Sequence, residues 1–356
     1  MEILKISKED FNSFIDEKRT ASAPLEGPGD SISGHAEKWK TIGVVKKGAN
    51  FVFAELNSAA ELCLDYDVTV LPPKKYFLPP KETLLKFIPK KAESYAAVNH
   101  PGPIALIGVH HYDLAAIHLM DRAFSEGERD EHYMKRRENS VLIGIYPTKH
   151  YKYRFSSSVI RGQFRKAADI MLVAMNGFFV VEILTEKGKN YLQGAELQEN
   201  DFSLADIEAA ANKIKDDQKI PLPIELVPEF LEKNHDHSAW DYFGGKCFSC
   251  ASCVLVCPTC YCFDVRDEVD LTLEAGKRVR TWDSCMLEDF ALTGEGFNFR
   301  AGRGARFRHR IYRKGKHLFE KYGYFGCVGC GRCAGSCTAG IAGPVKVLKY
   351  MLEHKQ

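Results

Sequence analysis

Cysteine is almost absent from the first two thirds of the sequence. Of 12 cysteines, only Cys63 precedes residue 247, and the other eleven lie between residues 247 and 337. Disulfide frameworks are typical of small secreted domains, and a chain of 356 residues is not one of these. In a reducing compartment, cysteines clustered in this way indicate metal binding.

The chain also lacks an excess of charge of one sign and a long apolar run. There are 49 basic and 47 acidic residues, a balance not typical of a nucleic-acid binder or an acidic tail. The most apolar stretch, residues 170–184, contains Asn176, Gly177 and Glu182 and is too short to span a bilayer. The first residues carry charges every few positions and no apolar signal-peptide core. We therefore expect a soluble, cytoplasmic protein.

Fingerprints of catalysis and nucleotide binding are missing as well. The sequence has no nucleophile elbow, no G-x-G-x-x-G turn after a strand and no P-loop. The scattered histidines, including His110, His150 and His237, have no metal-ligand spacing. These absences argue against an enzyme that acts alone.

Residues 1–220 predict an α/β domain. Short apolar runs at 42–45, 51–56, 104–109 and 141–146 predict strands. Residues 113–124 predict an amphipathic helix capped by Asp113, so that the last two strands and this helix form a βαβ crossover.

Turn and cap signals organise the rest of this region. Asn176-Gly177 predicts a hairpin, and residues 203–216 predict a helix capped by Ser203. Two Pro pairs predict that residues 71–82 form an extended surface loop. Residues 221–228 predict a linker to a second domain over residues 229–356.

The second domain contains two cysteine motifs of identical spacing, C-x2-C-x2-C-x3-C. In such motifs three closely spaced thiolates hold one corner each of a [4Fe–4S] cubane, and the fourth ligates the other cluster. The spacing predicts two clusters. The first set is Cys247, Cys250, Cys253 and Cys337. The second set is Cys327, Cys330, Cys333 and Cys257.

Zinc and a third cluster are the competing interpretations. Structural zinc sites favour two separated ligand pairs, which two four-cysteine runs do not resemble. Cys260, Cys262 and Cys285 supply three ligands for a further site but no fourth, so we expect them to be small buried packing residues.

The region between the motifs has apolar residues at helical spacing over residues 271–294 and 315–324. It predicts a mainly α-helical domain with the motifs at helix ends. Residues 300–316 hold eight Lys or Arg residues and no acid. They are typical of a solvated helix face or, with interleaved aromatics, of a nucleic-acid contact. We favour cations that compensate anionic clusters, together with a docking surface.

Several short segments resemble one known family in their order along the chain. They are "LPPKKYFLPPKE", "GVHHYDLAAI", "TEKG", "CPTCYCFDV", "WDSC", "GFNFR" and "CVGCGRC". Together they resemble the beta (iron–sulfur) subunit of cytosolic sulfhydrogenase-type NiFe hydrogenases and the related A subunit of anaerobic sulfite reductase. The resemblance implies a [4Fe–4S] dicluster subunit beside a flavin- and NAD(P)-binding reductase subunit and a catalytic redox subunit of hydrogenase, sulfite reductase or heterodisulfide reductase type.

The sequence departs from that family at identifiable positions. Aromatic residues, Tyr112, Tyr146, Tyr153 and Phe155, stand where the family often has cysteine. If those cysteines hold a site in relatives, this chain has lost it and filled the space with rings. Thr338 follows the second motif in place of the frequent proline.

Two functions from different classes follow. One is an electron-transfer subunit that relays single electrons between a flavin partner and a catalytic subunit. The other is a non-redox interaction protein with structural clusters and a basic nucleic-acid-binding stretch. The ordered family motifs favour electron transfer.

Overall fold

The structure, a computed structural model, describes residues 2–21, 38–89, 91, 95–97 and 102–354. The chain divides into two compact units. Unit 1 comprises Met1–Pro73, His100–His150 and Gly162–Lys215, and unit 2 comprises Lys74–Asn99, Tyr151–Arg161 and Asp216–Gln356. The predicted α/β region thus supplies unit 1 and two segments of unit 2.

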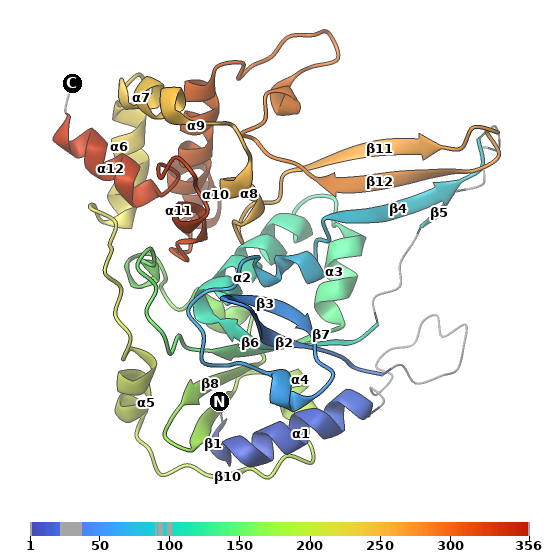
Figure 1. Ribbon diagram of the computed structural model, residues 1–356, viewed down its shortest axis with the longest axis vertical. Helices are drawn as coiled ribbons and strands as arrows, with labels where there is room; N and C mark the ends of the chain where they lie inside the picture. The colour runs from blue at the N-terminus through green and yellow to red at the C-terminus, as the bar shows by residue number, and fades with distance from the viewer. Residues whose placement is uncertain (1, 22–37, 90, 92–94, 98–101, 355–356) are drawn as a thin grey trace. The chain divides into compact units, whose positions relative to one another are not determined.

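Unit 1 is built on a mixed eight-stranded sheet with the order β10-β1-β9-β8-β7-β6-β2-β3 (Figure 1). Its strands are β1 (Glu2–Ser7), β2 (Lys40–Lys47), β3 (Asn50–Glu55), β6 (Ile104–His110), β7 (Ser140–Ile145), β8 (Ile170–Ala174), β9 (Phe178–Ile183) and β10 (Gln198–Glu199). The central strands β2, β6, β7 and β8 are parallel. β6 and β7 are buried along their whole length, as expected for parallel strands covered on both faces.

Helices cover both faces of this sheet, with α2 and α3 on one side and α1 and α4 on the other (Figure 1). Their bounds are α1 (Lys8–Thr20), α2 (His111–Ser125), α3 (Glu131–Glu138), α4 (Glu186–Tyr191) and α5 (Leu204–Ala211). Ser7 caps α1 and Ser203 caps α5 through their side chains. The expected α/β fold, the βαβ crossover and the hairpin at Gly177 are therefore all present.

Unit 2 contains a four-stranded antiparallel sheet with the order β11-β12-β4-β5 (Figure 1). Its strands are β4 (Lys81–Phe87), β5 (Ala96–Ala97), β11 (Phe263–Val269) and β12 (Gly276–Trp282). A buried salt bridge of 2.7 Å joins Arg280 on β12 to Glu82 on β4. The expectation of a mainly helical domain did not include this sheet.

The helical part of unit 2 carries both cysteine motifs. Its elements are α6 (Val227–Lys233), α7 (Ala239–Lys246), α8 (Ser252–Leu255), α9 (Arg303–Tyr312), a π-helical turn (Arg313–His317), α10 (Leu318–Tyr322), α11 (Arg332–Gly335) and α12 (Pro344–Glu353). One buried cluster, including Trp240, Phe243 and Phe307, packs these helices together with Cys257, Cys260 and Cys285.

Four local predictions need correction. Residues 276–282, expected to be helical, form strand β12, because they pair with β4. This partner lies far away in the sequence, so the local pattern does not indicate the pairing. The cap of α2 is His110 and not Asp113, because β6 runs directly into the helix.

The two proline-rich segments also differ from expectation. Pro73–Tyr76 form a 3-10 helix and not an extended loop, and Lys74 is buried. Residues 221–228 are no free linker, since Ile224 and Val227 belong to the core of unit 2. Over the described residues, no helix is long and apolar enough to cross a membrane.

Candidate iron–sulfur sites

The two cysteine motifs adopt the same local backbone. In the first, Ser249 and Ala251 have positive φ angles of 52° and 66°, and α8 follows. In the second, Gly329 and Gly331 have φ angles of 67° and 78°, and α11 follows. Two left-handed residues curl each Cys-x2-Cys-x2-Cys loop, so three thiols of each motif face one space.

The first cavity is lined by one of the two predicted cysteine sets. These residues are Cys247, Cys250, Cys253 and Cys337. The remaining wall is largely apolar and includes Phe248, Met286 and Phe307. Backbone N–H groups point at two of the sulfurs, from Ser249 to Cys247 and from Ile341 to Cys337, each at 3.4 Å.

The second cavity is lined by the other set. These residues are Cys257, Cys327, Cys330 and Cys333. The two cavities have similar volumes, so the two sites suit groups of similar size. The structure therefore brings together the cysteines that the spacing rule paired, including Cys257 with a motif that begins at Cys327.

A stripe of buried cations, Arg306, Arg310 and Lys314, lies beside the two cysteine motifs. Arg310 donates to the carbonyl of Ala342 at 2.8 Å, and Lys314 donates to the hydroxyl of Thr259 at 2.6 Å. The spacing i, i+4, i+8 in the sequence is the signal for this stripe, because it places all three on one helix face.

The thiols and the buried cations affect each other's ionisation. Burial opposes a charge on Arg310, but Cys253 and Cys333 hold its pKa well above the ordinary arginine value. Burial likewise opposes a charge on Lys314, and Cys257 with Cys260 raises its pKa. Burial raises the pKa of the Cys327 thiol to about 12.

These pKa shifts test whether the cysteine ligands and their surroundings fit iron–sulfur clusters. A buried thiol ionises only with compensating positive charge, and a buried cation is costly without a nearby anion. A cubane held by four thiolates is an anion, and Arg310 and Lys314 supply the positive charge beside it. The residues present therefore fit two such groups.

The segment that contains Tyr153 and Phe155 packs directly on the second motif. The N–H of Phe155 donates to the carbonyl of Gly329 at 2.9 Å. A Cβ at Gly329 would lie 2.6 Å from the nitrogen of Ser156, and one at Gly331 would lie 2.6 Å from the oxygen of Tyr153. Both glycines are thus required by close backbone approach as well as by positive φ.

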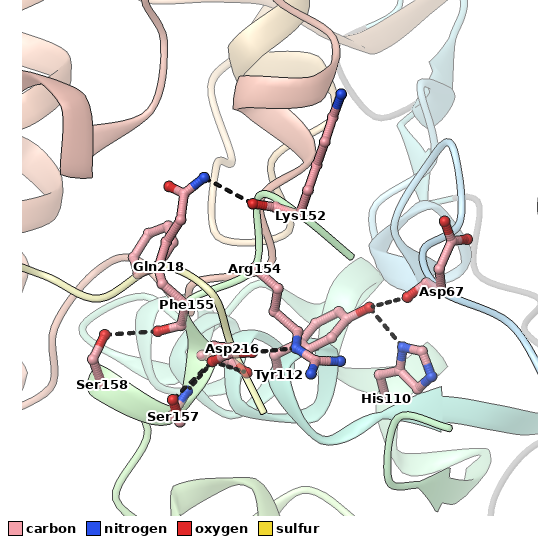
Figure 2. Close-up of polar contacts among 11 residues, drawn as sticks. Asp67, His110, Tyr112, Lys152, Arg154, Phe155, Ser157, Ser158, Asp216 and Gln218 are labelled. Carbon is pink, nitrogen blue, oxygen red and sulfur yellow. Dashed lines mark hydrogen bonds and ion pairs between the residues drawn. The ribbon is translucent and has the colours of Figure 1, made fainter. Parts of the chain in front are cut away.

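A buried carboxylate fixes this segment in place (Figure 2). Asp216 forms an ion pair with Arg154 and accepts hydrogen bonds from the backbone N–H and hydroxyl of Ser157 at 2.7 and 2.8 Å. The amide of Gln218 also donates to the carbonyl of Lys152 at 2.8 Å. No local sequence pattern predicts this arrangement, because Asp216 lies at the end of a stretch with the pattern of an exposed helix.

Tyr112 and Tyr146 belong to unit 1, where Tyr112 is fully buried and Tyr146 is partly buried. The hydroxyl of Tyr112 lies 2.6 Å from Nδ1 of His110 and 3.3 Å from the carbonyl of Asp67 (Figure 2). Burial raises the pKa of Tyr146 to about 12, and its hydroxyl accepts from Arg165 at 3.3 Å.

The surplus cysteines lie beside the second set. The Cys260 thiol contacts that of Cys257, and the Cys262 thiol contacts that of Cys285. Lys74, which the sequence predicts to lie on a surface loop, is buried and donates to the carbonyl of Cys260 at 2.6 Å. Within the described parts of the chain, no three His, Cys, Asp or Glu residues are arranged to hold a single metal ion.

Comparison with known proteins adds independent information. Residues 246–341 match the family model of the 4Fe-4S dicluster domain. The chain is 32% identical over 321 residues to sulfhydrogenase 2 subunit beta of Pyrococcus furiosus, which covers 89% of this chain and 93% of the relative. No solved structure matches.

Cavity geometry, cation placement and the domain match together define an iron–sulfur electron-transfer protein of the dicluster class. More specifically, the chain belongs to the family of sulfhydrogenase beta subunits. The family resemblance carried by the short motifs is thereby confirmed.

Proposed function

We propose that this chain relays single electrons through two [4Fe–4S] clusters within a multi-subunit oxidoreductase. One cluster is held by Cys247, Cys250, Cys253 and Cys337. The other is held by Cys327, Cys330, Cys333 and Cys257. The observation that carries this proposal is the division of eight cysteines into two four-thiol cavities.

The position of Arg310 supports electron exchange between the two sites. Its guanidinium hydrogen-bonds the Cys333 thiol of the second set and interacts electrostatically with Cys253 of the first set. One side chain reaches both sets, so the clusters would be close neighbours. A shared cation would also stabilise the reduced form of each cluster and raise both potentials.

The proposed partners are inferred from the family. The relative's name describes a beta subunit of a sulfhydrogenase, and the sequence has neither a G-x-G-x-x-G turn after a strand nor a P-loop. We propose that a flavin- and NAD(P)-binding reductase subunit exchanges electrons with one cluster. A catalytic subunit of hydrogenase, sulfite reductase or heterodisulfide reductase type would exchange electrons with the other.

Two measurements on the chain purified alone and anaerobically test this function. Dithionite should bleach the visible absorption, because the clusters accept electrons; unchanged absorption would favour structural clusters. With a viologen dye, the isolated chain should show no turnover with hydrogen, sulfite or NADPH. Turnover with NADPH by the flavin-free chain would contradict a relay that depends on its partners.

A further inference from the structure

A second charged hollow lies in unit 2, on the outer face of α9. It has a volume of about 210 Å³. Its wall includes two arginines, three histidines and two aromatic rings, among them Arg300, Arg308, His309, His317, Phe299 and Tyr312. No cysteine of either set takes part in its lining, so the proposed electron relay does not explain it.

The helix itself separates two groups of basic side chains. Arg306 and Arg310 point inward and are buried, whereas Arg308 and His309 line the hollow. The π-helical turn Arg313–His317 then adds one residue to the turn, and His317 joins the wall. Single π-helical turns are rare in proteins, and those that occur are often found at functional sites.

Neighbouring contacts fix that turn. Lys316 pairs with Glu232 at 3.1 Å and with Glu320 at 2.5 Å, so these carboxylates are engaged outside the hollow's wall. Gly315 fits against α6, where a Cβ would lie 2.7 Å from Cδ1 of Leu231. The geometry that brings His317 to the hollow is therefore built into the packing of unit 2.

The hollow concentrates positive charge. The Arg300 side chain has a buried Nε with no hydrogen-bond partner. Arg308 donates to the carbonyl of His235 at 3.0 Å and lies 3.6 Å from the exposed carboxylate of Asp236. Burial, with the charges of Arg300, His317 and Arg313, lowers the pKa of His309 to about 4.

The aromatic residues give the site a second chemical character. Tyr312 is buried, and its hydroxyl donates to the carbonyl of Leu231, so it forms the closed floor of the hollow. Phe299 is 69% exposed and offers the accessible ring. Guanidinium groups recognise phosphate oxygens through their fork of N–H donors, and aromatic rings stack on planar bases.

We propose that this hollow binds a nucleotide, with its phosphate between Arg300 and Arg308 and its base against the exposed ring of Phe299. A small hollow with cations inside and a ring at its edge suits one nucleotide. A nucleic-acid strand would instead require an extended basic groove.

The test uses calorimetry on the full-length protein with its clusters, and AMP, adenosine and inorganic phosphate as probes. AMP should bind at least about tenfold more tightly than adenosine, because only AMP carries the charge for the arginines. Arg300→Gln and Arg308→Gln should each weaken AMP binding by about tenfold. Phe299→Ala should weaken AMP binding and leave binding of inorganic phosphate unchanged.

A matched control is Arg266→Gln, since Arg266 is an exposed arginine on β11 with 82% of its side chain accessible. It should leave AMP binding unchanged. Unaltered visible absorption and circular dichroism identify variants that still fold. Equal binding of AMP and adenosine, no binding of AMP, or an equal loss in Arg266→Gln would overturn the proposal. The proposal would also be overturned if a single-stranded oligonucleotide displaced AMP and bound more tightly than AMP when the two are compared at equal phosphate concentration.

Discussion

The hydroxyl of Thr259 donates a hydrogen bond to the carbonyl of Gly326 at 2.7 Å, across 67 positions of sequence. Thr259 follows Cys257 at the end of the first motif, and Gly326 precedes Cys327 at the start of the second. Lys314 reaches the same hydroxyl at 2.6 Å. This small network brings the last cysteine of one motif to the first three of the other.

Replacing Cys257 with Ser should therefore damage the cluster held by the second motif and spare the first. A serine oxygen is a poorer ligand for cluster iron than a thiolate. Electron paramagnetic resonance of the reduced protein checks this, with Cys63→Ser as control because Cys63 lies in unit 1. Loss of the signal that Cys250→Ser also removes, with the other signal intact, would contradict the assignment.

Arg310→Gln should lower the potentials of both clusters. The glutamine retains a donor for the carbonyl of Ala342 but removes the charge that stabilises the reduced state. We expect a fall of about 60 mV or more, the equivalent of roughly 1.4 kcal/mol for one electron. A potentiometric titration measures it. Arg278→Gln, at an exposed ion pair with Asp267, should change neither potential; equal shifts in both variants would remove the special role of Arg310.

Gly331→Ala should destabilise the second motif far more than Gly340→Ala. Both glycines have positive φ, 78° and 63°, and an alanine there costs roughly 1 kcal/mol through backbone strain alone. Only at Gly331 would the new Cβ meet backbone, 2.6 Å from the Tyr153 oxygen. Retention of the second cluster after anaerobic purification is the measurement. Equal retention of the second cluster in the two variants would show that residues 151–161 do not restrict the space at Gly331.

Asp216→Asn should lower the free energy of unfolding by about 3–5 kcal/mol, because it deprives the buried Arg154 of its carboxylate. Both side chains are almost inaccessible, at 2% and 3%. The control is Glu229→Gln, which breaks an exposed pair with Lys233 and should cost at most about 1 kcal/mol. Chemical denaturation compares the two. Similar losses would mean that the Arg154–Asp216 pair contributes no more than a surface contact.

Local patterns and long-range contacts explain which features were predictable. The buried strands and the Asn176-Gly177 hairpin follow from short-range periodicity and turn chemistry, and both are present. The segment of strand β12 has apolar residues at helical spacing, and its pairing with β4 depends on Glu82 and Arg280, which lie 198 positions apart. Burial of Lys74 depends in the same way on the distant carbonyl of Cys260.

The candidate sites likewise combine features set by local spacing with features set by long-range packing. The ligand sets rest on spacing, which the chemistry of a cubane restricts tightly. The attachment of residues 151–161 to the second motif rests on packing against Gly329 and Gly331, and no local pattern announces it. Cations on α9 were visible as a run, but their separation into an inner stripe and an outer hollow required the helix and its π-helical turn.

The number of clusters is the central claim, and iron analysis of anaerobically purified protein tests it most directly. Two cubanes predict about eight iron atoms and an equal amount of acid-labile sulfide per chain. Cys262→Ala should leave that number unchanged, because Cys262 is expected to pack beside the second set without binding iron. A value near twelve that falls to eight in Cys262→Ala would contradict the claim and establish a third cluster.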